Sequence, residues 1–199
     1  WGVWSLPESD INALGDLRGK QVLELGCGAA QLSIAIAEMG GYATALDNSE
    51  KQLEHAARLM AEAGHDFPLL HASADKIPAK KRSFDLVFCD HGAMTYAPTA
   101  PTLAEVHRVL QKNGLFVFNM QSPLHEICYD DKAGSVSNTL CKSYFDLDRF
   151  VEDKLVYFQY SYGEWVRHFR EAGFNIIDLI ELQPPEDAKS SFDFAPLEW

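Results

Sequence analysis

An apolar run that ends abruptly in a glycine turn and continues as a helix-like segment most constrains the fold of this chain. The run Val22–Leu25 contains a single acid, Glu24, and the glycines Gly26 and Gly28 follow it directly. Apolar residues then recur at helical spacing over Leu32–Met39. A buried parallel strand turns into a helix in this way, and the glycines let a ligand approach the backbone closely. The sequence therefore predicts a strand–turn–helix unit that binds a ligand at its turn.

A second apolar run ends in an acid at the distance expected for a nucleoside-binding site. The run Ala43–Leu46 precedes Asp47, which lies about 20 residues after the glycines. A carboxylate at this place accepts hydrogen bonds from both ribose hydroxyls of a bound nucleoside. The two runs together predict that the chain binds an adenosine-type cofactor.

The glycine pattern distinguishes between adenosine cofactors. A dinucleotide site usually has a third glycine three residues after the second, so that the helix packs closely under a pyrophosphate. Gln31 occupies that position, and no basic residue stands nearby to meet a phosphate. Glu24 lies two residues before Gly26, where its charge would repel a pyrophosphate and suit an ammonium or sulfonium group. These residues favour S-adenosylmethionine over NAD.

These motifs resemble those of the class I, Rossmann-like, S-adenosylmethionine-dependent methyltransferases, whose first motif is acid-x-Gly-x-Gly and whose second strand ends in an acid. Phe84-Asp85 is similar to the start of the family's fourth strand, and Gly173-Phe174 to the turn before its sixth. The resemblance implies a three-layer α/β fold, with a mostly parallel sheet and helices on both faces. It also implies an enzyme that transfers a methyl group from S-adenosylmethionine to a small-molecule acceptor and releases S-adenosylhomocysteine.

The resemblance, together with the expected strand ends, places one set of residues at the cofactor. This set is Trp4, Glu24, Gly26, Cys27, Gly28, Asp47, Asn48, Gln52, Ser73, Ala74, Asp75, Asp90 and His91. Either Ser73 or Asp75 is expected to contact the adenine amine, because alignment from Pro78 puts Ser73 in the usual acid's place. Trp4 belongs to an aromatic start that either folds over the cofactor or packs the predicted helix Glu8–Leu14 against the sheet.

A candidate general base follows the predicted fourth strand. Methyl transfer mainly requires alignment of nucleophile, methyl group and sulfur, so a base is needed only for an acceptor that arrives protonated. His91 is the candidate, since histidine titrates near neutrality and the adjacent Asp90 can orient it. Adjacent strand residues point in opposite directions, so one is expected to face the cofactor and the other the acceptor. His125 and Glu126 are the second candidates.

The regular alternation of strands and helices breaks between residues 121 and 160. A structureless loop of this length is rare in a compact domain unless it is a lid or a binding element. In this fold the segment would rise over the carboxyl ends of the strands, where ligands bind. We therefore expect a single domain over residues 1–199, in which residues 121–160 are a substrate-binding or lid insertion. The alternative is a solvated loop with an extra strand.

Further elements follow from periodicity and capping residues. Helices are predicted from Ser49 to Gly64, over Pro101–Gln111 and from Ser161 to Gly173, and strands over Phe67–His71, Ser83–Cys89, Leu115–Met120 and Phe174–Leu182. The family usually closes its sheet with a seventh, antiparallel strand, but residues 184–199 show no strand-like run. We expect that the chain is cut short there or that this strand is replaced.

Composition argues against several partners. A formal net charge of −12 argues against nucleic acid, whose phosphates are bound by Lys and Arg. No apolar run approaches the roughly 18 residues of a membrane span. The scattered cysteines show no metal-like spacing, so we expect no metal site and reduced thiols in a cytoplasmic protein.

Two other functions stay open: a nicotinamide-dependent oxidoreductase, and a non-catalytic module that binds S-adenosylmethionine or S-adenosylhomocysteine. The acceptor and the oligomeric state do not follow from the sequence.

Overall fold

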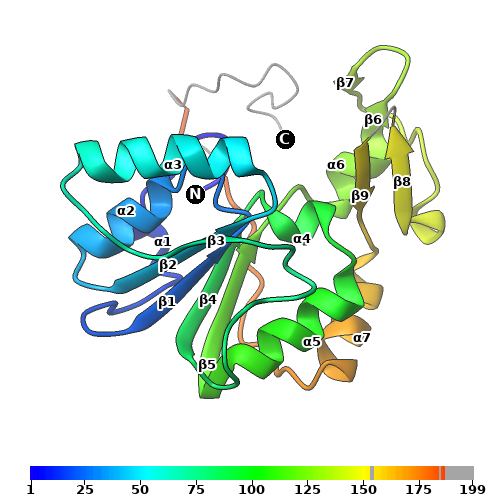
Figure 1. Ribbon diagram of the computed structural model, residues 1–199. Coiled ribbons are helices and arrows are strands. Elements are labelled where there is room, and N and C mark those ends of the chain that lie inside the picture. The colour runs from blue at the N-terminus through cyan, green and yellow to red at the C-terminus, as the bar shows by residue number, and fades with distance from the viewer. Residues whose placement is uncertain (153–154, 184, 187–199) are drawn as a thin grey trace.

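The computed structural model describes residues 1–152, 155–183 and 185–186. Within them the main sheet has five strands, all parallel, in the order β3-β2-β1-β4-β5 (Figure 1). The strands are β1 (Gln21–Leu25), β2 (Tyr42–Asp47), β3 (Leu69–His71), β4 (Phe84–Asp90) and β5 (Leu110–Asn119). The chain builds outward from β1 to β3 and then crosses back to β4. The carboxyl ends of β1 and β4 therefore form the crevice where open α/β sheets bind ligands.

Helices cover both faces of this sheet (Figure 1). Successive strand residues point to opposite faces, so that Val22 packs with the helices of one layer and Leu23 with those of the other. The first layer contains α2 (Gln31–Glu38) and α3 (Glu50–Glu62), and the second contains α4 (Ala93–Tyr96), α5 (Thr99–Val109) and α7 (Tyr162–Glu171). This is the expected three-layer α/β fold.

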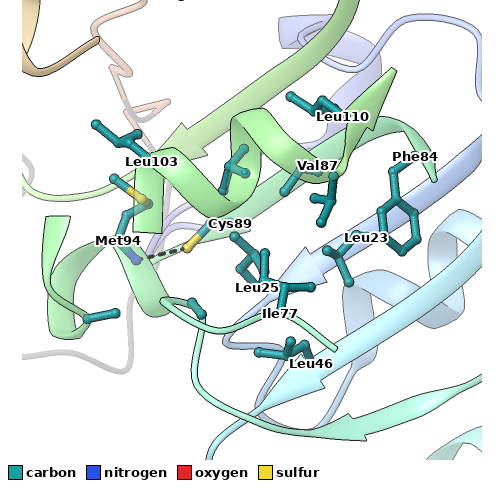
Figure 2. Packing of buried hydrophobic residues seen from close by; sticks show 14 of the residues in the cluster. Leu23, Leu25, Leu46, Ile77, Phe84, Val87, Cys89, Met94, Leu103 and Leu110 are labelled. Atoms are coloured by element: carbon teal, nitrogen blue, oxygen red, sulfur yellow. Dashed lines mark hydrogen bonds between the residues drawn. The ribbon is translucent and has the colours of Figure 1, made fainter. Parts of the chain in front are cut away.

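The core under α4, α5 and α7 fixes the turn that follows β4. Leu23 and Val87 of the sheet are fully buried against Leu103 of α5 (Figure 2). The Met94 amide of α4 donates a hydrogen bond of 3.4 Å to the Cys89 sulfur of β4 (Figure 2). Because this bond ties α4 to the end of β4, the intervening turn is held in place over the carboxyl edge of the sheet.

The segment between β5 and α7 has secondary structure and a small core of its own. It lies beyond the carboxyl end of β5, at the upper right of Figure 1. Its elements are α6 (Pro123–Cys128), the antiparallel pair β6 (Tyr129–Asp130) and β7 (Ser135–Val136), the 3₁₀ turn η1 (Tyr144–Asp146), and the antiparallel pair β8 (Arg149–Glu152) and β9 (Leu155–Phe158). Ile127, Cys128 and Leu147 are buried together beneath them.

The predicted helix starts are confirmed at two capping residues. The Ser49 hydroxyl accepts a hydrogen bond from the Gln52 amide at 3.4 Å at the start of α3. Ser161 and Glu164 form a complete capping box at the start of α7. These caps satisfy amides that a helix leaves without intrahelical partners.

The structure corrects two expectations. The run Phe174–Leu182 is not a strand: within the described residues β5 pairs only with β4, and an extended segment without a neighbour gains no ladder of hydrogen bonds. Ile177 in this run is 82% exposed. The helix expected over Glu8–Leu14 is the short α1, which ends at Ile11 because Asn12 adopts a left-handed φ of 53°.

The sheet edge beyond β5 is described only in part. Strand β5 begins at Leu110, earlier than the expected Leu115, with a register shift against β4 between Phe84 and Leu86. Residues 184–199, where the sequence shows no seventh strand, lie outside the described residues except for 185–186.

Candidate active site

The two glycines of the turn after β1 serve different purposes. Gly26 has a φ of +68°, and a Cβ there would lie 2.5 Å from the backbone nitrogen of Ala93. A Cβ on Gly92 would in turn lie 2.6 Å from the Gly26 oxygen, so the turns after β1 and β4 are in direct backbone contact. Gly28, at φ +51°, has open space beside it, with Gln52 Oε1 4.0 Å from the Cβ position. A ligand can therefore approach the backbone at Gly28, whereas Gly26 is required by packing.

Asp47 is fixed at the carboxyl end of β2 by backbone amides. Its Oδ2 accepts a hydrogen bond from Gly28 N, and its Oδ1 accepts one from Ser49 N, both at 2.8 Å. The side chain is buried. A carboxylate has about four lone-pair sites, so both oxygens keep acceptor capacity for ribose hydroxyls. An acceptor of fixed orientation thus lies beside the open glycine, which is an arrangement that a nucleoside fits.

Glu24 lies behind the glycine turn. It is 4% exposed, and its Oε2 accepts hydrogen bonds from Ser33 N at 3.0 Å and from Ser33 Oγ at 2.5 Å. Burial raises the pKa of Glu24 to about 8, although the Ser33 hydrogen bonds oppose the shift. The nearby carboxylates of Asp90 and Asp47 add to the increase. Near pH 7 the carboxyl is therefore largely neutral, and a cation bound nearby would favour its ionised form.

Asp90 and Asn119 close the carboxyl edge of the sheet between β4 and β5. Asn119 Nδ2 donates a hydrogen bond to Asp90 Oδ1 at 2.7 Å, and the Asn119 carbonyl accepts one from His91 N at 2.9 Å. The Gly2 amide donates to the same carboxylate, at 3.2 Å from Oδ1 and 3.0 Å from Oδ2. The first residues of the chain are thereby held over the end of β4.

The aromatic start of the chain packs α1 against the sheet. The Trp1 ring meets Phe88 edge-on, with centroids 6.2 Å apart, and its indole nitrogen donates a 2.5 Å hydrogen bond to Glu8 of α1. The Trp4 indole nitrogen is buried and has no acceptor among the described residues. Of the two expected roles of the aromatic start, Trp1 packs the helix against the sheet. Contact between Trp4 and the cofactor stays a prediction.

His91 follows β4 in a conformation that is rare for a residue other than glycine. Its φ is +50°, in the left-handed region that costs about 1–2 kcal/mol. Burial lowers the pKa of the imidazole below its ordinary value; the Asp90 carboxylate opposes this shift and His125 adds to it. His125, the second candidate, lies on α6, where its amide donates a hydrogen bond of 3.0 Å to the Ser122 hydroxyl. Glu126, the other candidate, pairs instead with Lys142 at 2.7 Å.

The remaining predicted cofactor residues near the first two strands contribute differently. The side chains of Cys27 and Ala74 are buried in the two cores, so only their backbones can face a ligand. Burial also raises the pKa of the Cys27 thiol, and contact of Cys27 and Ala74 with the cofactor stays a prediction. Asn48 follows Asp47, and its carbonyl lies 3.1 Å from His71 Nε2.

The loop after β3 is fastened to helix α5. It carries Ser73 and Asp75, the two candidates for the adenine amine. Glu105 Oε2 accepts a hydrogen bond from Ile77 N at 2.8 Å, and Arg108 donates one to the Ile77 carbonyl at 2.9 Å. Arg108 and Glu105 also pair with each other at 2.7 Å. This clamp holds the loop at the carboxyl edge of the sheet, while the choice between the two candidates stays a prediction.

Sequence analysis missed the partners that orient the acids. Ser33 holds Glu24, and Asn119 and Gly2 hold Asp90. One signal was available: Asn119 is a polar residue at the end of an apolar strand, and parallel neighbouring strands end at the same edge. Gly2 offers no such signal, because its contact follows only from where the start of the chain lies.

The fold and the glycine–acid site define a Rossmann-like nucleoside-binding enzyme, and comparisons with known proteins narrow the class. A family model described as a methyltransferase domain matches residues 22–114. A ubiquinone biosynthesis O-methyltransferase of Aromatoleum aromaticum is 34% identical over 178 residues, which are 86% of this chain and 71% of that protein. The S-adenosylmethionine-dependent methyltransferase of Mesorhizobium loti shares the fold, with a TM-score of 0.75 at 22% identity over 93% of this chain and 88% of that one.

A further relative matches about half of this chain. A demethylmenaquinone methyltransferase of Lactococcus lactis is 34% identical over 111 residues, or 54% of this chain. The chain spans only 44% of that relative's length.

The chain belongs to the class I S-adenosylmethionine-dependent methyltransferases. It is an enzyme whose methyl donor is S-adenosylmethionine and whose reaction is methyl transfer to a small-molecule acceptor. The residues present fit that donor, because Gly28 leaves its backbone open beside the oriented carboxylate of Asp47. The expected fold, cofactor and reaction are confirmed, and the two other classes of function left open by the sequence are set aside.

Proposed function

We propose that this methyltransferase acts on a hydroxyl group of a small aromatic acceptor, of the phenol or catechol type found in quinone precursors. The observation that carries the proposal is the place of His91, a half-buried imidazole at the carboxyl edge of β4 beside the glycine turns. The relative that covers most of this chain is named for O-methylation in ubiquinone biosynthesis, which supports the same acceptor class.

His91 has the properties of a general base for such an acceptor. Its pKa is lowered by burial, so the imidazole is neutral near pH 7 and can accept the hydroxyl proton. The left-handed φ of His91 and the 2.9 Å hydrogen bond from His91 N to the Asn119 carbonyl fix the backbone from which the imidazole extends. Bound S-adenosylmethionine supplies an electrophilic methyl group on its sulfonium. His91 takes the proton from the acceptor oxygen as that oxygen becomes the nucleophile.

The segment 121–160 supplies the acceptor-binding wall in this proposal, within a single domain over residues 1–199. It carries His125 on α6 and aromatic rings suited to a flat acceptor. Two of these rings, Phe150 and Tyr157, are stacked with centroids 5.0 Å apart. Ordered wall elements exclude water from the acceptor, which the alignment of a methyl-transfer reaction requires.

The test is methylation of catechol-type acceptors by the purified chain, with His91→Ala compared against His55→Ala on the exposed face of α3. His91→Ala should lower kcat by a factor of about 10² to 10⁴, the usual contribution of a general base. In this proposal His91 faces the acceptor and Asp90 faces the cofactor, so binding of S-adenosylmethionine should stay unchanged in both variants. His55→Ala should keep wild-type kcat. Methylation that proceeds equally well in His91→Ala would refute the role of His91, and no turnover of any hydroxyl acceptor by the wild type would refute the acceptor class.

Methylation of a ring carbon is the second candidate, because several relatives are named demethylmenaquinone methyltransferases. Those matches cover less than half of the relatives' length, so they support this candidate less than the O-methylation relative supports the first. NMR of the methylated product separates the two outcomes, since a methoxy group and a ring methyl give distinct carbon shifts.

We further propose a cytoplasmic enzyme that needs neither nucleic acid nor a membrane. The net charge of −12 disfavours phosphate-rich partners. In the parts of the chain that the structure describes, no helix is long and apolar enough to cross a membrane. The cysteines are unpaired thiols, in keeping with a reducing compartment.

A further inference from the structure

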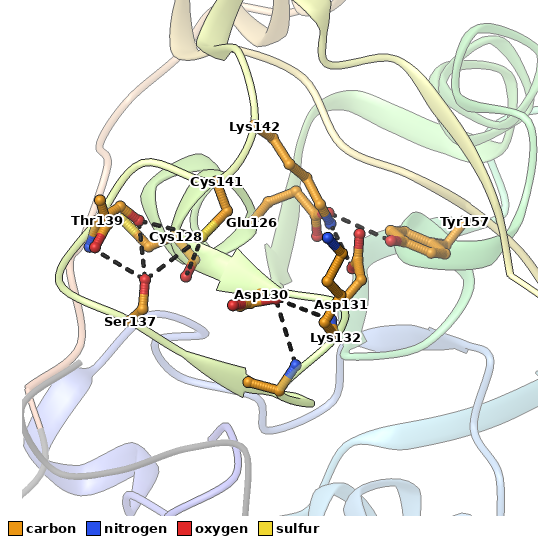
Figure 3. A network of polar contacts seen from close by, with 11 residues as sticks. Glu126, Cys128, Asp130, Asp131, Lys132, Ser137, Thr139, Cys141, Lys142 and Tyr157 are labelled. Carbon is orange, nitrogen blue, oxygen red and sulfur yellow. Dashed lines mark hydrogen bonds and ion pairs between the residues drawn. The ribbon is translucent and has the colours of Figure 1, made fainter.

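A lysine in the insertion is enclosed by acidic and aromatic side chains from several elements. Lys142 Nζ lies 2.7 Å from Glu126 Oε1 of α6 and 3.1 Å from Asp131 Oδ1, which follows β6 (Figure 3). The Tyr157 hydroxyl of β9 donates to the same Glu126 oxygen at 3.3 Å (Figure 3). The Lys142 and Glu126 side chains are only 17% and 12% exposed. Such enclosed charges interact more strongly than pairs on an open surface.

The same ammonium connects to His125 through an aromatic ring. Lys142 Nζ lies 5.6 Å from the centroid of Tyr129, within the range of a cation–π contact. The Tyr129 ring stacks on His125 with centroids 6.1 Å apart and planes inclined by 22°. His125 also precedes Glu126 on α6, so the lysine acts on this helix from two sides. The charge of His125 in turn influences His91 at the end of β4.

We propose that Lys142 is a positioning residue for the reaction: it fixes helix α6, and with it the position of His125. This inference rests on the proposed function, since it concerns the acceptor side of the same site. Lys142 touches neither of the two histidines in the described contacts and works through Glu126 and the Tyr129 ring. Its task is to hold His125 in place rather than to exchange a proton itself.

The charge balance explains why a lysine is required there. Lys142 pairs with two carboxylates, of which Glu126 is 12% exposed and Asp131 is 61% exposed and solvated. Removal of the lysine therefore leaves the enclosed Glu126 charge uncompensated, which costs more than the pair itself contributes. Without the ammonium, the uncompensated Glu126 carboxylate is more stable in solvent, and we expect α6 to shift as Glu126 turns outward.

The experiment compares Lys142→Met and Lys142→Arg with Lys132→Met, an exposed lysine of the same insertion. Each variant is assayed with S-adenosylmethionine and two acceptors: catechol, and a nitro-substituted catechol whose hydroxyl is already ionised at neutral pH. Lys142→Met should lower kcat about tenfold to a hundredfold with catechol. Displacement of His125 disturbs the removal of the hydroxyl proton, a step that only a protonated acceptor requires. The loss with the nitrocatechol should be several-fold smaller. Lys142→Arg should recover most of the activity, and Lys132→Met should match the wild type.

Two further measurements separate the outcomes. Backbone amides of α6 should exchange hydrogen faster in Lys142→Met than in the wild type, whatever acceptor the enzyme uses. The Kd for S-adenosylmethionine should stay within about twofold, because the partners of Lys142 are not residues assigned to the cofactor. Unchanged exchange and unchanged kcat, or equal losses with both acceptors, would overturn the positioning role. If Lys142→Met does not fold, Glu126→Gln keeps the size and hydrogen-bonding atoms and should show the same pattern more weakly. Failure of the wild type to methylate either acceptor would count against the proposed function instead.

Discussion

The glycine-turn half of the site and the insertion fix their polar side chains by different means. In the glycine-turn half, Glu24, Asp47 and Asp90 each accept a hydrogen bond from a backbone amide. In the insertion, Glu126 and Asp131 are held by other side chains, chiefly by Lys142. The positions of backbone amides are already fixed by the fold. Paired side chains instead order each other and lose rotamer freedom when they pair. The first arrangement is therefore rigid by construction, and the second depends on each partner.

This difference extends to distance along the chain. Asp47 reaches Ser49 over two positions and Gly28 over 19, all within one strand–turn–helix unit and its neighbour. Glu126 reaches Lys142 over 16 positions and Tyr157 over 31, across elements that form only when the insertion folds. A comparison of substitutions in the two regions should show whether the glycine-turn half tolerates loss of a side chain less than the insertion does.

The largest effect is expected for Gly26→Ala. The added Cβ would lie 2.5 Å from the Ala93 nitrogen at a φ of +68°, so both strain and overlap with backbone arise. We expect a loss in the free energy of unfolding of about 3–5 kcal/mol, from left-handed strain and overpacking together. Gly15→Ala is the matched control, with a φ of +66° and no atom within 4 Å, and should lose only about 1 kcal/mol. Equal losses in urea denaturation would show that packing against the β4 turn is unimportant.

A pH-dependent effect is expected at Glu24. Burial raises the pKa of this carboxyl to about 8, so the folded state keeps a proton that the unfolded state releases near its ordinary pKa of 4.5. The stability of the wild type should therefore fall as pH rises from about 4.5 to 8 and then level, by up to a few kcal/mol. Glu24→Gln keeps an oxygen to accept from Ser33 but cannot ionise. The stability difference between wild type and Glu24→Gln should follow that slope, and a difference independent of pH would contradict it.

A smaller effect is expected for Asp47→Ala, measured on cofactor binding. The carboxylate orients Gly28 and Ser49 and is the acceptor offered to the ribose hydroxyls. Its loss should weaken binding of S-adenosylmethionine by roughly 1.5–3 kcal/mol, the scale of hydrogen bonds to a charged group. Asp85→Ala removes a carboxylate that accepts from Gln21 N at the opposite edge of the sheet. Calorimetry should find unchanged affinity in that control, and unchanged affinity in Asp47→Ala would remove Asp47 from the cofactor site.

The same contrast explains what the sequence could predict. The order of strands and helices from Gln21 to Asn119, and the convergence of the β1, β2 and β4 ends, follow from local apolar periodicity and glycine turns. Lys142 could not be identified in this way, because nothing local distinguishes it from Lys132 ten positions earlier. Its partners come together only through the tertiary fold of the insertion.

The failed strand prediction has a related cause. Phe174–Leu182 has the apolar content of a strand, but strand formation depends on a neighbouring strand that supplies hydrogen-bond partners. Within the described residues no such neighbour lies beside it. Local composition thus predicted all five strands of the described sheet, the edge strands β3 and β5 included, and failed for a run that pairs with no described strand.

The smallest effect is expected for Tyr157→Phe, and it tests the insertion directly. Burial and the Glu126 carboxylate raise the pKa of the phenol, so it stays protonated and donates to Glu126 at 3.3 Å. Phenylalanine keeps the stacking on Phe150 and removes only the hydroxyl, which should cost about 0.5–1.5 kcal/mol in urea denaturation. Tyr42→Phe, at a tyrosine 61% exposed, is the control and should cost nothing measurable. If the side chains of the insertion order one another, Tyr157→Phe and Glu126→Gln should be non-additive in a double-mutant cycle, whereas strict additivity would mean that Lys142 alone holds Glu126.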